Sequence, residues 1–129
     1  MNGWGVAADA LVVAHLGFVC FAVLGGWAVL HRPRLAFLHL PVVAWAVWIE
    51  ISGGVCPLTP LENAWRLRAG EAGYEGGFVE HYLLAILYPE GLTAAAQIVL
   101  GLGVLVINLA FYGALCRRLW LRRRRAMAE

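Results

Sequence analysis

The sequence is poor in charge and contains no lysine. Of its 129 residues, 14% are charged and 62% are hydrophobic, and the mean hydropathy is +0.74. A soluble helical bundle needs polar faces at the helical period, whereas residues 10–30 and 92–115 carry almost no polar side chains. The shortage of charge therefore argues against a soluble protein and predicts a single helical membrane domain over residues 1–129.

Several motifs of soluble enzymes and secreted proteins are also missing. The three cysteines form no Cys-x-x-Cys pair, which excludes a thioredoxin-like redox motif and a c-type haem attachment motif. The glycine-rich stretch at residues 70–77 is followed by neither Lys-Ser/Thr nor a Rossmann strand, so it is not a phosphate-binding loop. Because no positive charge precedes the first apolar run, we expect that run to be retained and not cleaved as a signal peptide.

Three apolar runs are long enough to cross a bilayer. They cover about residues 10–30, 35–55 and 92–115, and each has the ~20 residues that a hydrocarbon core of ~30 Å requires. A shorter run at 78–88 stops at Pro89 and predicts an interfacial or re-entrant helix. The capping-box pattern from Thr59 to Glu62 predicts another short helix over about residues 60–69. The expected fold is an all-α integral membrane bundle with three transmembrane helices and two short extracytoplasmic helices.

The placement of arginine predicts the orientation of the chain. Arg32 and Arg34 lie between the first two spans, and six more arginines follow the third. The positive-inside rule puts both groups in the cytoplasm, so residues 116–129 form a basic cytoplasmic tail and the N-terminus and residues 56–91 lie outside. Beside a span, such a tail indicates contact with anionic lipid and not with nucleic acid.

Polar side chains inside the predicted spans fall into two layers. Counting ~1.5 Å per residue places His15, Glu50 and Gln97 near the outer ends of the spans, and His39 and Asn108 near the inner ends. Placing an ionisable group in a membrane costs roughly 2.5–3.5 kcal/mol, whereas an interhelical hydrogen bond returns about 0.6 kcal/mol. The outer layer is therefore either a functional site or a set of hydrogen bonds that fixes the bundle. For His39 we expect a backbone carbonyl or a lipid headgroup as partner.

Helical spacing also predicts which faces pack. His15 falls in a stripe of small residues that lets helices approach closely, Ala8, Ala22 and Gly26. Trp45 and Trp48 point away from the His39–Glu50 face, toward lipid or another subunit.

The segment between the second and third spans offers further candidates. Glu80 and His81 join the outer layer if the short helix at 78–88 folds back onto the bundle, and His15, Glu50 and His81 are then candidate ligands for a metal or haem. Otherwise Glu80 is a first-turn acid favoured by the helix dipole and His81 faces solvent. The segment also holds two predicted headgroup contacts and one candidate thiol, namely Arg66, Arg68 and Cys56.

Three runs of the sequence resemble a known family. They are RPRLAFLHLP at 32–41, CPLTPLEN at 56–63 and GYEGGFVEHYLLAILYP at 73–89, in this order around the apolar spans. The chain resembles, from about His15 to Tyr112, the small bacterial membrane proteins of the domain of unknown function 2784 family. This resemblance implies a multi-pass protein of the bacterial inner membrane, and it implies no activity, cofactor or catalytic residue.

Three functions remain open. The first is a non-enzymatic subunit or accessory protein that docks a membrane partner or a second copy through its tryptophan-bearing faces. The second is a metal- or haem-binding membrane protein. The third is an enzyme or transporter that acts on a lipid or quinone at the outer leaflet, with Glu50 as acid or base. The sequence specifies no cofactor and shows no nucleophile–base spacing, so whether the protein is an enzyme stays open.

Overall fold

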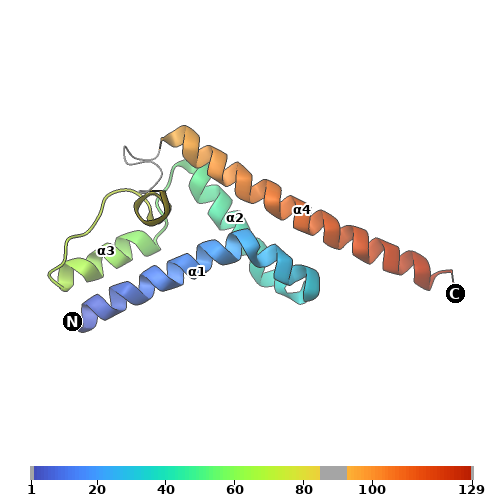
Figure 1. The fold of residues 1–129 in the computed structure, drawn as a ribbon, viewed down its shortest axis with the longest axis horizontal. Coiled ribbons are helices and arrows are strands. Elements are labelled where there is room, and N and C mark those ends of the chain that lie inside the picture. The colour runs from blue at the N-terminus through green and yellow to red at the C-terminus, as the bar shows by residue number, and fades with distance from the viewer. Residues whose placement is uncertain (1, 85–92, 129) are drawn as a thin grey trace.

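The computed structural model describes residues 2–84 and 93–128, which form a helical bundle (Figure 1). Its long helices are α1 (Gly3–His31), α2 (Ala36–Ser52) and α4 (Ala94–Ala126), and α3 (Leu58–Arg68) is shorter. A 3-10 turn, η1 (Pro33–Leu35), precedes α2, and a π-helical segment, η2 (Val79–Leu84), follows α3. The predicted all-α fold is confirmed.

Within the described residues, three helical units are long and apolar enough to cross a membrane, namely α1, η1 with α2, and α4. The three predicted spans are therefore confirmed, although their ends differ. α1 begins at Gly3 because the side chain of Asn2 accepts a hydrogen bond from the amide of Gly5 at 3.0 Å and caps the helix. α2 ends at Ser52 because Gly53 adopts a left-handed conformation with φ of 65°. The chain is a multi-pass membrane protein.

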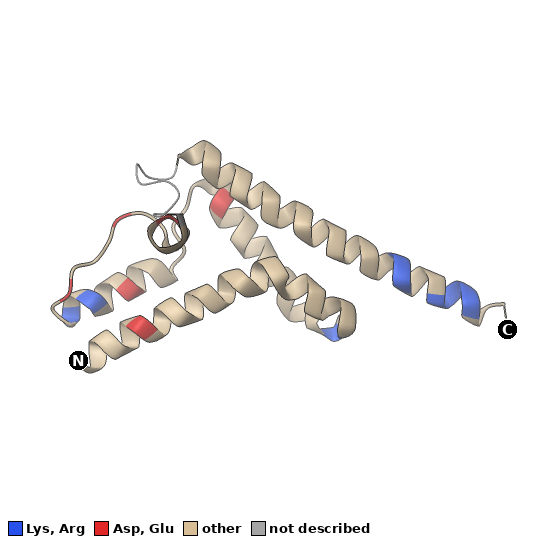
Figure 2. Cartoon of the chain, in the orientation of Figure 1, with Lys and Arg blue, Asp and Glu red and all other residues tan. Residues whose placement is uncertain are grey.

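The arginine tail continues α4 as a helix. α4 extends beyond the region where α1 and α2 pack against it, and its arginines lie on this extension (Figure 2). Acidic residues gather at the opposite part of the fold, around α3 and the start of α1 (Figure 2). Residues 116–126 of the expected basic tail thus form a charged helical extension.

The capping-box interpretation of Thr59 and Glu62 is wrong. Pro57 occupies the N-cap with helical dihedral angles, φ −56° and ψ −21°, so α3 begins at Leu58 and Thr59 lies within its first turn. In the described part of the chain, no side chain caps this helix start. Glu62 instead points into the fold and is fully buried. The second short helix is present as η2, and residues 85–88 of its predicted range lie outside the described residues.

Two polar side chains, one from α2 and one from α4, hydrogen-bond to backbone carbonyls of α1. Nε2 of His39 lies 3.0 Å from the carbonyl oxygen of Phe21, and the amide nitrogen of Asn108 donates to the next carbonyl, that of Ala22, at 2.8 Å. Because a carbonyl can only accept, Nε2 carries the imidazole proton and Nδ1 accepts from the hydroxyl of Tyr112 at 3.0 Å. His39 thus bonds a backbone carbonyl, one of the two partners that the sequence suggested.

The predicted stripe of small residues is the buried face of α1. Ala8, His15, Ala22 and Gly26 are all buried. A Cβ atom at Gly25 would lie 2.6 Å from the His39 ring, and one at Gly26 would lie 2.6 Å from the Phe111 ring. These glycines are therefore needed for α2 and α4 to approach α1 closely enough to reach its carbonyls.

Candidate functional site

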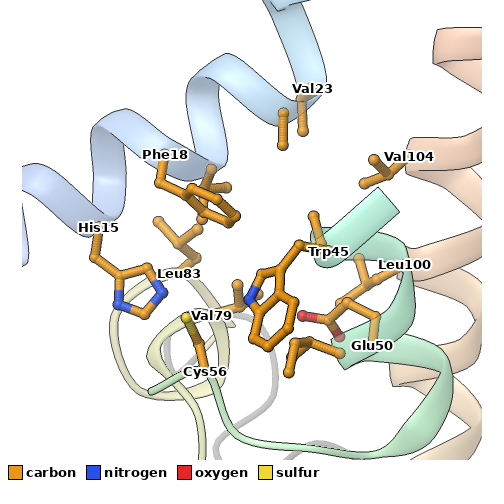
Figure 3. A pocket seen from close by; sticks show the side chains of 14 residues that line it. His15, Phe18, Val23, Trp45, Glu50, Cys56, Val79, Leu83, Leu100 and Val104 are labelled. Atoms are coloured by element: carbon orange, nitrogen blue, oxygen red, sulfur yellow. The ribbon is translucent and has the colours of Figure 1, made fainter. Parts of the chain in front are cut away.

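A cavity of about 230 Å³ lies between α1, α2, α4 and η2 (Figure 3). Most of its lining is apolar and includes Phe18, Val23, Trp45, Val79, Leu83 and Leu100. Three polar side chains also line it, His15 from α1, Glu50 from α2 and Cys56 from the turn before α3. In Figure 3 His15 and Glu50 lie on opposite sides of the cavity, with Cys56 and Trp45 between them. We call it the His15–Glu50 cavity.

His15 is fixed in place by an aromatic ring. Its side chain is 3% exposed, and it stacks on Phe78 with ring centroids 4.0 Å apart and planes 22° apart. Nδ1 of this imidazole is buried and has no hydrogen-bond partner among the described residues. Buried polar atoms are nearly always hydrogen-bonded, so an unpaired nitrogen beside a cavity is a candidate ligand contact.

Glu50 presents a second unpaired polar atom. It lies in the last turn of α2, where its Oε2 is buried and has no hydrogen-bond partner among the described residues. Close packing on α4 holds it there, because a Cβ added at Gly101 would lie 3.0 Å from the Glu50 Cβ. An ionisable side chain at such a depth in a span usually has a function.

Four of the five predicted outer-layer residues come together. His15, Glu50, Glu80 and Gln97 all line a smaller space of about 30 Å³ beside the main cavity, and Cys56 lines both. Glu80 accepts a hydrogen bond from the amide of Gly77 at 3.4 Å. The short helix has thus folded back onto the bundle, as the sequence analysis allowed.

The fifth predicted residue, His81, lies elsewhere. Its ring is exposed and stacks on Tyr74, with centroids 3.9 Å apart and planes 10° apart, beside a separate space of about 320 Å³. Within residues 2–84 and 93–128, no three His, Cys, Asp or Glu side chains are grouped so that they could hold a metal ion. Metal binding by His15, Glu50 and His81 therefore stays a prediction that the geometry does not support.

A buried carboxylate organises the region next to the cavity. Oε1 of Glu62 accepts hydrogen bonds from Nε of Arg66 at 2.9 Å and from the hydroxyl of Tyr82 at 2.7 Å. Its Oε2 accepts from the hydroxyl of Tyr74 at 2.8 Å. We call these residues the Glu62 cluster. Glu62 is 0% exposed, so its charge depends on these three donors for stabilisation.

Arg66 bonds to carboxylates on two other segments of the chain. Its guanidinium donates to Glu71 at 2.9 Å and to Asp9 of α1 at 3.4 Å. The bond to Glu62 raises the pKa of Arg66 above its ordinary value. Arg68 instead lies over the Trp4 ring, 4.7 Å from its centroid. Headgroup contact by Arg66 and Arg68 stays a prediction, and Arg66 has internal partners that compete with such a contact.

Comparison with known proteins identifies a family for this chain. Residues 5–113 match the family described as Protein of Unknown function (DUF2784). The chain belongs to this family. The match covers the cavity and the Glu62 cluster and ends before the arginines of α4, and it confirms the resemblance found in the sequence. Neither a curated protein nor a solved structure matches the chain.

Sequence reasoning missed the central role of Glu62 in this DUF2784 protein. One signal was present, because Glu62 and Arg66 are four residues apart and therefore adjacent on a helix. The tyrosine partners lie 12 and 20 residues away, Tyr74 in the glycine-rich stretch and Tyr82 in the predicted short helix, and no spacing rule relates either of them to Glu62. Only the folded arrangement of α3 and η2 brings their hydroxyls to one carboxylate.

Proposed function

We propose that this protein is a non-enzymatic membrane accessory protein that binds a lipophilic small molecule, a lipid or a quinone, in the His15–Glu50 cavity. One observation carries the proposal. Two buried polar atoms that have no hydrogen-bond partner among the described residues, Nδ1 of His15 and Oε2 of Glu50, lie beside a mostly apolar cavity. Binding sites for small molecules commonly combine an apolar lining with a few polar groups that fix the orientation of the ligand.

The chemistry of the two polar groups selects the ligand class. Nδ1 of His15 donates or accepts according to the tautomer, and a neutral Glu50 carboxyl both donates and accepts. A ligand with carbonyl or hydroxyl oxygens on an apolar body satisfies both groups. Trp45, which is 44% exposed, stands at the wall of the cavity, so an apolar tail can leave toward the bilayer between the helices.

The proposed location follows from the charges. Arginines at the η1 end of the bundle and along the last turns of α4 favour the cytoplasmic side of a bacterial inner membrane. The N-terminus, α3 and η2 are then outside, and the cavity draws its ligand from the outer leaflet. A role as a subunit that presents this ligand to a larger membrane complex is compatible with that position.

A larger side chain placed in the cavity tests the proposed binding site. Ala46 lines it, so Ala46→Phe places a ring where the ligand would lie, whereas Ala44→Phe puts the same ring on an exposed position of the same helix. We expect a short-chain quinone or a phosphatidylglycerol probe to quench or shift the tryptophan fluorescence of the purified protein. Ala46→Phe should weaken this binding at least about tenfold, and Ala44→Phe should leave it within about twofold.

The two ligand sources give different results. Saturable quenching by the quinone that excess phosphatidylglycerol does not displace identifies a quinone site, and the reverse order of affinity identifies a lipid site. Equal binding of either probe to the Ala46→Phe and Ala44→Phe variants would exclude the cavity as the binding site.

A further inference from the structure

The π-helical segment η2 forms one wall of the His15–Glu50 cavity. Val79 and Leu83, one turn apart, line the cavity (Figure 3), and Val79 also lines the smaller space. Phe78, the residue before η2, is 3% exposed and stacks on His15. π-Helical turns are rare and frequently occur at functional sites. η2 therefore covers the cavity, and Phe78 directly before it holds the imidazole that the ligand would meet.

The other face of η2 is tied to α3. The hydroxyl of Tyr82 donates to Glu62 at 2.7 Å and accepts from Arg66 at 3.1 Å. Tyr82 also contacts Phe78, with ring centroids 5.0 Å apart. A continuous set of contacts thus runs from the buried carboxylate through Tyr82 and Phe78 to His15.

The segment before η2 is tied to the same carboxylate. Tyr74 donates to the second oxygen of Glu62, and its ring stacks on His81 of η2. The amide of Asn63 donates to the Tyr74 carbonyl at 2.8 Å, and the Tyr74 amide donates back to the Asn63 side chain at 3.1 Å. Hydrogen bonds to a charged acceptor are about twice as strong as neutral ones. Two such bonds to Glu62, donated by Tyr74 and Tyr82, therefore fix both ends of residues 74–82.

We propose that Glu62 is a positioning residue for the cavity: through Tyr82 it keeps η2 closed over His15 and so controls ligand entry. When the Tyr82 hydroxyl leaves Glu62, η2 loses its direct hydrogen bond to that buried carboxylate, and Val79, Leu83 and Phe78 separate from the cavity together. Control of ligand entry rests on the proposed function, because it requires a ligand in the His15–Glu50 cavity. The opening of η2 can be measured without any ligand.

Cys56 reports this opening, because it lines both spaces that Val79 covers. The two exposed cysteines, Cys20 and Cys116, are replaced by serine, and the rate at which N-ethylmaleimide modifies the remaining thiol of the full chain in detergent is measured. We expect Tyr82→Phe to raise this rate about tenfold, since it removes one hydrogen bond to a charged group. Glu62→Gln should raise it at least as much.

The control is another tyrosine hydroxyl. Tyr112→Phe removes the bond to His39 inside the bundle and leaves the bonds to Glu62 in place, so it should lower stability without changing the Cys56 rate. Helical circular dichroism and gel filtration confirm folding. If Glu62→Gln does not fold, Tyr82→Phe decides alone. If a folded Tyr82→Phe variant reacts with N-ethylmaleimide at the same rate as the chain that keeps Tyr82, the proposal is overturned.

The two proposals fail in different ways. If Cys56 of Tyr82→Phe is modified faster but neither quinone nor phosphatidylglycerol protects it, the closing role of η2 stands and the proposed ligand is excluded. If a probe protects Cys56 but all variants are modified at equal rates, the proposed ligand stands and the role of Glu62 is excluded.

Discussion

His39 and Asn108, from different helices, bond to consecutive carbonyls of α1, those of Phe21 and Ala22. The hydroxyl of Tyr112 supports the first bond by donating to Nδ1 of His39. We expect Tyr112→Phe to lower the free energy of unfolding by about 0.6 to 1.7 kcal/mol, the usual range for a hydrogen bond between membrane helices. Thermal unfolding in detergent measures this loss. No loss of stability would mean that His39 keeps its orientation without the phenol.

The glycines beside these carbonyls predict a steric effect. Gly25→Ala brings a methyl group to 2.6 Å from the His39 ring, a distance that real Cβ atoms do not tolerate. We expect a loss of about 1–3 kcal/mol, as for other overpacked sites. Gly17→Ala on the same helix is the matched control, since no atom of the described residues, outside its own helical turn, lies within 4 Å of a Cβ there. It should be neutral or stabilising by up to about 1 kcal/mol. Equal effects of the two substitutions would refute close packing at Gly25.

The Glu62 cluster predicts a dependence of stability on alkaline pH. Burial, followed by the bond to Glu62, raises the pKa of Tyr74 and Tyr82 above the ordinary value of 10.0. The folded state therefore keeps these phenols neutral where the unfolded chain ionises them. Their contribution to stability is complete below about pH 10 and is lost as pH rises toward the raised folded values. We expect the melting temperature to fall above that pH, and less steeply in the Tyr74→Phe, Tyr82→Phe double variant. An unchanged slope would contradict the assignment.

The proposed orientation can be measured on whole cells. In a chain with its three cysteines replaced by serine, Glu75→Cys and Ala126→Cys place single thiols at exposed positions near opposite ends of the fold. A membrane-impermeant maleimide added to intact bacteria with a permeable outer membrane should modify position 75 and spare position 126 until the cells are lysed. The opposite pattern would place the arginines of α4 outside.

The sequence predicted the three spans well because apolar length is a local property. It also placed His15, Glu50 and Gln97 at similar heights, since the rise of a helix is constant and all three line one space. Glu62 escaped prediction because its partners come from distant segments. The predicted capping box of Thr59 and Glu62 is wrong because Pro57 adopts helical dihedral angles, so α3 begins at Leu58, before Thr59. For His81, no periodic pattern could show which face of a six-residue π-helix meets the bundle.

Bonds to two successive carbonyls have a consequence for the evolution of α1. A helix held at Phe21 and Ala22 can neither spin about its axis nor slide by one residue without losing both bonds. One amino acid inserted between His15 and Phe21 would turn everything before it by about 100°, carrying the imidazole away from Phe78 and the cavity. The six-residue interval between His15 and Phe21 therefore sets the angle at which this histidine faces its neighbours, so substitutions there should be tolerated where insertions and deletions are not.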